Sequence, residues 1–186
     1  MKRLFIAIHL HEEARHKTAA LLHRLPYDRS LKFVPEENLH LTLVFVGNTK
    51  EEKIPDIEDA IEEAAQPIKP FTLTFTRLGA FPDLKKPHVV WFGIEEPTGQ
   101  LASLVNRLRE ALEKRKVNLI DHKPFLPHLT LARVKGPLHS KVIPELKKIA
   151  SERHEIPSVE VSSIELVESV LGREGPTYSE LYRYLL

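Results

Sequence analysis

The sequence predicts a duplicated fold built from strands and helices, with two similar lobes. Each half of the 186-residue chain follows the order strand, helix, strand, helix, strand. The tetrapeptide His-Leu-Thr-Leu occurs at residues 40–43 and again at 128–131, an offset of 88 residues. The same offset links Phe71 to Val159, where two matching alternating strands begin. A period this long that occurs twice indicates an internal duplication and not a solenoid.

The two halves are expected to share one domain. No linker rich in Gly or Ser separates them, so we predict a single two-lobed domain over residues 1–186 with approximate repeat halves 1–82 and 83–186. If a pseudo-two-fold axis relates the lobes, equivalent strands face each other across a central cleft. Hydrophobic residues make up 42% of the chain, which is enough for a real core.

The elements of the first half follow from local patterns. Residues 3–9 are rich in β-branched and aromatic side chains, which predicts a strand. Residues 12–25 carry apolar side chains at helical spacing and are followed by a proline, which predicts a helix. After a short extended segment, the apolar run 39–47 ends at Gly-Asn and predicts a strand. Isoleucines on one side predict a helix over 51–66, and Phe or Leu alternating with Thr predicts a strand over 71–78.

The second half repeats this order by the same criteria. Its predicted strands cover residues 88–94, 126–134, 159–167 and 178–186, and its predicted helices cover residues 98–116 and 140–152.

The repeated tetrapeptide places two kinds of side chain on opposite faces of a strand. Residues i and i+2 of a strand share a face, so His40 and Thr42 lie together, and so do His128 and Thr130. The leucines between them anchor the strand in the core. A duplication kept only for packing would retain the leucines and let the exposed His and Thr change. The repeat therefore favours a functional role for all four polar residues.

Two imidazoles and two hydroxyls around one small site suit phosphoryl chemistry. Opening a cyclic phosphodiester needs a base that activates water and an acid that protonates the departing oxygen, and histidine can serve as either near neutral pH. The hydroxyls of Thr42 and Thr130 can donate to phosphate oxygens. Arg133 can pair with phosphate through its guanidinium fork. Strict alternation puts Arg133 on the leucine face, so either a β-bulge or the bend before Gly136 is needed to turn it toward the histidines.

Composition and charge exclude several other classes of protein. Lys and Arg number 27 against 26 Asp and Glu, which excludes a protein that coats nucleic acid through bulk charge but leaves room for a local anion site. The absence of cysteine excludes thiol chemistry and Cys-based metal sites. There is no glycine-rich phosphate loop. Few Met and Gln residues with 14 Pro are typical of a thermophile composition.

No segment has the pattern of a membrane-spanning helix or of a signal peptide. The first apolar run is too short for a signal peptide, and no run approaches the roughly 18 apolar residues of a membrane span. We therefore expect a cytoplasmic protein.

Other residues have simpler interpretations. His11 and His16 resemble a zinc-protease helix but stand five apart, about 140° around a helix, so they cannot share a metal. His9 with His11 offers no third ligand, so we expect no metal site. Phe5 and Trp91 are predicted to be core residues. Phe125 is as suited to pack a base or ribose as to pack the core. The lysine pairs 85–86 and 147–148 are predicted to be solvated surface.

Two longer phrases carry a resemblance to a known family. Asn38-Leu-His-Leu-Thr-Leu-Val-Phe-Val-Gly47 and Pro124-Phe-Leu-Pro-His-Leu-Thr-Leu-Ala-Arg133 resemble the paired motifs of the two-histidine phosphoesterases, and most closely the RNA 2′,3′-cyclic phosphodiesterases, also called 2′-5′ RNA ligases. The opening run from Arg3 and the ending Gly175-Pro-Thr-Tyr178 are also similar to that family. The resemblance covers essentially the whole chain.

The resemblance implies a fold, an activity and residue roles. The fold would be α+β and bilobal, with two antiparallel sheets facing a central cleft and helices outside. The activity would be metal-independent hydrolysis of RNA 2′,3′-cyclic phosphate ends to a 2′-phosphomonoester, with no cofactor. His40 would be the proton donor and His128 the proton acceptor, while Thr42, Thr130 and Arg133 would hold the phosphate.

Two other functions remain open from the sequence. The same site could act mainly as a 2′-5′ RNA ligase that joins tRNA halves. Alternatively, the chain could be a non-catalytic module that binds nucleotides or RNA ends, although intact His and Thr in both motifs disfavour this. In each case the expected partners are RNA ends, tRNA halves or 2′,3′-cyclic nucleotides, with no membrane, and the expected assembly is a monomer.

Overall fold

The computed structural model describes residues 1–120, 124–172 and 175–186 and confirms the predicted mixture of strands and helices. The strands are β1 (Lys2–His9), β2 (Leu31–Phe33), β3 (His40–Thr49), β4 (Phe71–Phe81), β5 (Val89–Glu95), β6 (His128–Val134), β7 (Val159–Val161), β8 (Ser163–Leu171) and β9 (Pro176–Leu185). The α-helices are α1 (Glu12–Leu22), α2 (Ile54–Ala65), α3 (Gln100–Lys114) and α4 (Val142–Ser151).

The strands form one antiparallel sheet with two arms. Its order is β7-β4-β5-β6-β3-β1-β8-β9, with β2 paired to β6. The arms meet where β3 pairs with β6, through the single residue pair Leu41 and Leu129. We call β3, β1, β8 and β9 the first arm, and β6, β5, β4, β7 and β2 the second arm. The two sheets expected from the sequence are thus the two arms of one continuous sheet.

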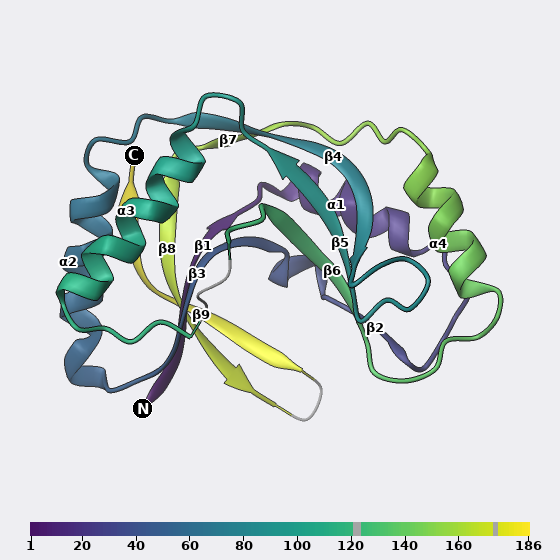
Figure 1. Ribbon diagram of the computed structural model, residues 1–186, viewed down its shortest axis with the longest axis horizontal. Helices are drawn as coiled ribbons and strands as arrows, with labels where there is room; N and C mark the ends of the chain where they lie inside the picture. Colours follow the sequence, from purple (N-terminus) through teal and green to yellow (C-terminus); the bar gives the residue numbers. More distant parts are fainter. Residues whose placement is uncertain (121–123, 173–174) are drawn as a thin grey trace.

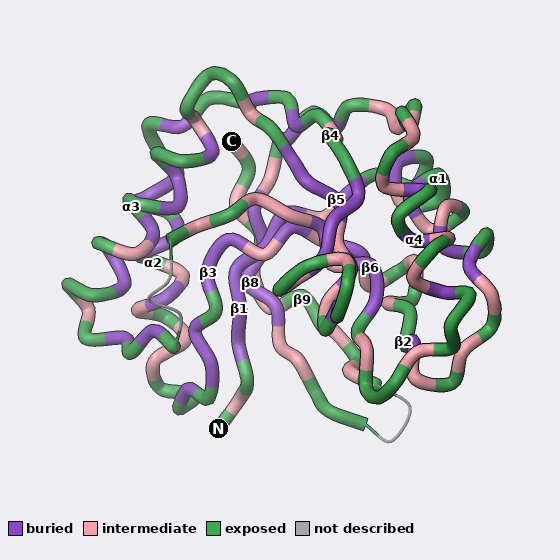
Figure 2. Tube along the Cα trace, turned by 45° about the vertical axis from the view of Figure 1, so that its right-hand side comes forward, coloured by how far each residue is buried: buried purple, intermediate pink, exposed green. Residues whose placement is uncertain are grey.

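The helices cover the outer sides of the sheet, as predicted. Helices α2 and α3 lie together beside the first arm, and α1 and α4 lie beside the second arm (Figure 1). Each of α2, α3 and α4 buries one apolar stripe, such as Ile57 and Ile61 in α2, because apolar residues at spacings of three and four share a helix face. The burial map shows the inner strands buried and the outer helix faces exposed (Figure 2). None of the helices in the described ranges is long and apolar enough to cross a membrane.

The two sequence halves interleave instead of forming one arm each. The first arm takes β1 and β3 from the first half and β8 and β9 from the second. The run 159–167, predicted as one strand, is β7 and β8 separated at Ser162. β7 pairs with β4 in the second arm, whereas β8 pairs with β1 in the first. The apolar residues are Val159 and Val161 before Ser162 but Ile164 and Leu166 after it, so the alternation breaks where the chain changes partners, and the prediction of one continuous strand was wrong.

The duplication is visible in the backbone as two equivalent β-bulges. In β3, the partners of β1 skip Leu43 and also Val46, and in β6 the partners of β5 skip Leu131, which lies 88 residues after Leu43. Each extra residue reverses the alternation beyond it. As a result, Phe45 and Arg133 project from the same face as the His and Thr of their own strands, which we call the motif face. The bulge predicted as one way to turn Arg133 toward the histidines is therefore present.

Candidate active site

The four polar side chains of the two motifs lie around the joint between the arms. The pair Leu41 and Leu129 is antiparallel, so the same register places His40 opposite Thr130 and Thr42 opposite His128. The leucines are fully buried, whereas the four polar residues are half-buried on the motif face. The structure thus brings the predicted residues together on one face of the sheet.

Both imidazoles are oriented by the same backbone contact. Nδ1 of His40 lies 2.7 Å from the carbonyl oxygen of Asn38, and Nδ1 of His128 lies 2.7 Å from the carbonyl oxygen of Leu126. A carbonyl can only accept, so Nδ1 donates in both rings. The proton that each ring can gain or lose is therefore on Nε2. Both histidines are held in the orientation and tautomer that leave Nε2 for chemistry.

His40 lies in an aromatic environment that changes its proton affinity. Phe5 stacks on its ring with centroids 4.8 Å apart, and the edge of Tyr178 approaches at 5.2 Å. Burial lowers the pKa of His40 to about 4, although the hydrogen bond to Asn38 opposes this, and the charges of neighbouring basic groups lower it further. In the neutral ring, Nε2 accepts from the Thr42 hydroxyl at 3.1 Å. The free site therefore holds His40 as a neutral imidazole near pH 7.

His128 has different aromatic neighbours, which come from β4 and β5. The edge of Phe81 lies 5.2 Å from its ring centroid, and Trp91 lies 6.3 Å away. Trp91 was predicted to be core, but it is half-buried on the motif face. Its ring lies directly over Gly79, where a Cβ atom would come within 2.5 Å of the indole. Glycine at position 79 therefore lets the indole lie flat against the sheet beside His128.

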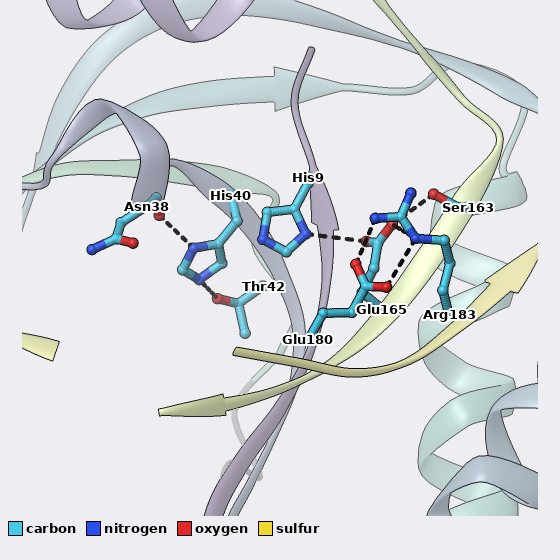
Figure 3. A network of polar contacts seen from close by, with 8 residues as sticks. All are labelled: His9, Asn38, His40, Thr42, Ser163, Glu165, Glu180 and Arg183. Carbon is cyan, nitrogen blue, oxygen red and sulfur yellow. Dashed lines mark hydrogen bonds and ion pairs between the residues drawn. The ribbon is translucent and has the colours of Figure 1, made fainter. Parts of the chain in front are cut away.

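A charged network lies on the other side of His40 (Figure 3). His9 is the β1 partner of His40, with ring centroids 6.2 Å apart, and its Nδ1 lies 3.3 Å from a carboxylate oxygen of Glu165. Ser163 donates to Glu165 at 2.6 Å, and Arg183 Nε lies 3.9 Å from it. Burial raises the pKa of Glu165, but the hydrogen bonds from His9 and Ser163 outweigh it, so the pKa is lowered. The site thus contains an ionised carboxylate that is only 1% exposed.

The remaining predicted residues occupy different places. Arg133 is exposed, and its charge reaches both His40 and Tyr178. Phe125 is half-buried and packs against the hydrophobic core, so its part in substrate binding stays a prediction.

The sequence missed several residues next to the imidazoles: Phe5, His9, Phe81, Trp91 and Tyr178. Phe5 is buried, as predicted, but it belongs to a small separate cluster with Tyr178 and stacks on His40. Of these residues, Tyr178 could have been noticed in the sequence, because it ends the segment Gly175-Pro-Thr-Tyr178 that is similar to the phosphodiesterase family.

No metal centre is formed within the described residues, where no three or more His, Cys, Asp or Glu residues gather closely enough to bind an ion. His11 instead caps helix α1, with its side chain accepting from the backbone N–H of Ala14 at 3.2 Å. His16 is exposed and lies 3.4 Å from Glu36. His11 thus serves as a helix cap, and His16 lies at the surface beside a carboxylate.

Comparison with solved structures defines the class of protein. A protein of Thermus thermophilus, TT0787, matches with a TM-score of 0.82 at 30% identity, covering 99% of this chain and 97% of that chain. LigT of E. coli, solved with 3′-AMP, matches with a TM-score of 0.70 at 31% identity, covering 100% of this chain and 98% of that chain. The fold is that of a LigT-like phosphoesterase.

Sequence comparison then gives the family. The profile of the 2′-5′ RNA ligase superfamily matches residues 7–173. A protein of Archaeoglobus fulgidus named RNA 2′,3′-cyclic phosphodiesterase is 36% identical over 179 residues, covering 96% of this chain and 97% of its own length. A protein of the same name from Methanothermobacter thermautotrophicus is 32% identical over 186 residues, covering 96% of each chain. The chain belongs to the 2′-5′ RNA ligase superfamily, as its motifs predicted.

Proposed function

We propose that this protein hydrolyses the 2′,3′-cyclic phosphodiester at RNA ends to a 2′-phosphomonoester, using two histidines and no metal. The observation that carries the proposal is the equivalent orientation of His40 and His128. Each is fixed through Nδ1 by a carbonyl two residues earlier, and both lie on the motif face. The names of the relatives point to the same reaction.

The reaction assigns one proton transfer to each ring. Nε2 of His128 accepts a proton from water as the water oxygen attacks phosphorus. The bond from phosphorus to the 3′ oxygen breaks, and His40 donates its Nε2 proton to that oxygen. Thr42 and Thr130 donate hydrogen bonds to the nonbridging oxygens, and Arg133 neutralises the charge that develops there. General acid and base catalysis of this kind contributes about 10²–10⁴-fold each.

The low pKa of His40 gives substrate binding a role in this mechanism. A pKa of about 4 leaves His40 neutral in the free site at pH 7, yet a proton donor must be charged. An anionic phosphodiester beside the ring favours the charged form and raises the pKa. The substrate itself therefore prepares the donor, and the free protein spends little time with both rings charged. Both motifs come from one chain, so we propose that a monomer is the functional unit.

The direct test uses an oligonucleotide that ends in a 2′,3′-cyclic phosphate, incubated with the protein in excess chelator. We expect a 2′-phosphomonoester product, identified by its phosphorus NMR shift. An unchanged cyclic end in the presence of folded protein would refute the proposal, and tight binding without product would support the binding-module alternative. Loss of activity on chelation would refute the metal-independent mechanism.

Ligation is the second candidate, favoured by the description of the superfamily. The same geometry would let His128 deprotonate an RNA 5′-hydroxyl in place of water, so that the attack forms a 2′-5′ linkage. Comparing the rates of hydrolysis and of joining with paired tRNA halves decides which reaction dominates.

A further inference from the structure

A pair of cations lies on the motif face beyond the histidines. In the register of β2 and β6, Lys32 is directly opposite Arg133. Directly opposite residues of an antiparallel pair share a face and have Cβ atoms about 5 Å apart. Leu31, the neighbour of Lys32, is buried in the core, so Lys32 must project from the opposite face. Lys32 therefore lies beside Arg133 on the motif face.

A third cation extends this surface. Lys135 follows β6, two residues after Arg133, and is exposed. Its backbone N–H donates to the carbonyl of Ser30 at 2.8 Å, so the pairing with the β2 segment continues to this residue. Because residues two apart in an extended strand share a face, Lys135 continues the line that begins at Arg133. We call Lys32, Arg133 and Lys135 the basic surface.

The positive charges of the basic surface are not neutralised by ion pairs within the described parts of the chain. Among the described residues, no carboxylate forms an ion pair with any of its three members, whereas Lys2, Arg24, Lys53 and Arg115 elsewhere each have one. Like charges directly opposite each other destabilise a strand pair. This cost is offset when an anion binds between them. The net charge of the chain is only +1, so this is a local feature and not part of a general positive field.

The internal duplication provides a comparison for the same place in the other arm. The residues 88 positions from Lys32 and Arg133 are Ile120 and Phe45. They are also neighbours, because the Ile120 N–H donates to the Phe45 carbonyl at 3.4 Å, and both are exposed. The same backbone arrangement therefore carries an apolar pair in the first arm and a cationic pair in the second. The charges are a property of these side chains and not a requirement of the fold.

We propose that Lys32 and Lys135 of the basic surface bind the internucleotide phosphate that precedes the cyclic end, so that the protein acts on RNA chains in preference to mononucleotides. Arg133 holds the cyclic phosphate beside His40, and Lys32 and Lys135 hold the next phosphate along the chain. This inference rests on the proposed phosphodiesterase function and adds to it a second phosphate-binding position for RNA chains.

The test compares two substrates that differ only in that phosphate. One is a nucleoside 2′,3′-cyclic monophosphate, and the other is a dinucleotide that ends in a 2′,3′-cyclic phosphate. The measured quantity is the ratio of kcat/KM for the dinucleotide to that for the mononucleotide. We expect a ratio well above one for the unmodified protein, decreasing as salt increases because a counterion is released on binding.

The variants are Lys32→Ala, Lys32→Arg and a control, Lys69→Ala. We expect Lys32→Ala to lower the ratio about fivefold, as for one exposed ion pair, and Lys32→Arg to restore it. Lys69 is an exposed lysine in the loop between α2 and β4, on the α2 side of the molecule (Figure 1), and its replacement leaves the ratio unchanged. Turnover of the mononucleotide verifies that each variant is folded.

The outcomes separate this inference from the proposed function. If the unmodified protein opens neither cyclic substrate, the proposed function fails. If it opens both but the ratio is near one, or if Lys32→Ala and Lys69→Ala give equal ratios, only the basic surface is refuted.

Discussion

The two arms of the sheet have the same backbone plan and different side chains. Each presents a His-x-Thr strand at the joint, fixes the imidazole through a carbonyl two residues earlier, and has a bulge residue three positions after the histidine. Beyond the bulge, the first arm places Phe45 where the second places Arg133. Across the strand pair, the first arm places His9 opposite His40, whereas the second places Gly93 opposite His128.

This difference separates the roles of two locally identical motifs. In the first arm, Phe5 and Tyr178 enclose His40 and make its charged form unfavourable. In the second arm, Arg133 and Lys32 supply positive charge at an exposed edge. The two arms thus orient two imidazoles alike and surround them differently, which is the difference that the proposed acid and base roles require.

The largest effect should come from removing either imidazole. We expect His40→Ala and His128→Ala each to lower kcat by about 10³-fold or more, since each removes one proton transfer. His23→Ala is the matched control, because His23 is exposed just after α1. Thermal unfolding verifies that the variants are folded. Full activity in either variant would remove that histidine from the mechanism.

The burial of His40 should also appear in the pH dependence of stability. The native pKa of about 4 is below the unfolded value of 6.5, so the unfolded chain takes up the proton first as the pH falls. Stability is full above pH 6.5 and decreases toward pH 4, with a total loss of about 3 kcal/mol from this group. Denaturant unfolding of the unmodified protein and of His40→Gln over this range isolates the contribution. A difference between the two that does not change with pH would contradict the buried, neutral ring.

The sequence predicted the parts of this site that depend on local pattern. The alternation of His and Thr with Leu correctly placed Leu41 and Leu129 in the core and the polar residues on the opposite face. The alternation also indicated that Arg133 needs a β-bulge or a bend to reach the motif face, and β6 contains the bulge. These features depend on residues within a few positions of each other.

The local sequence pattern could not predict which strands pair with each other. The apolar positions shift by one residue at Ser162 and Ser163, but no local feature shows that β7 pairs with β4 while β8 pairs with β1. Tyr178 lies beside His40 only because β9 pairs with β8 and β8 with β1. Trp91 looked like core because its strand is apolar, but its direction follows from the register with β4 and β6.

Arg133 and Phe45 allow a direct test of the asymmetry between the arms. Arg133→Ala should lower kcat/KM about 100-fold, since it removes charged hydrogen bonds to the phosphate. Phe45→Ala, at the equivalent place in the first arm, should lower it less than tenfold. Steady-state kinetics on one cyclic substrate measures both. Equal losses would mean that the two arms contribute alike, and the assignment of the phosphate to the second arm would be wrong.

The smallest effect should come from His9, which distinguishes the surroundings of the two imidazoles. The positive charge of His9 lowers the pKa of His40, so His9→Gln should raise that pKa from about 4 while the amide still donates to Glu165. Titration of the His40 ring followed by NMR measures the change, with His23→Gln as the control. An unchanged or lower pKa would show that His9 acts only through Glu165.

A residue equivalent to His9 does not fit opposite His128 in the second arm, where Gly93 lies. The difference between the two arms is therefore fixed by the packing around this glycine. A Cβ atom at Gly93 would lie 2.5 Å from the Thr76 hydroxyl oxygen and 3.3 Å from the Trp91 ring. A side chain opposite His128 would therefore have to displace the Thr76 hydroxyl and would press on the indole that packs beside that histidine. The second arm therefore has no room for a counterpart of His9, whereas the first arm holds His9 together with Phe5 and Tyr178 around His40.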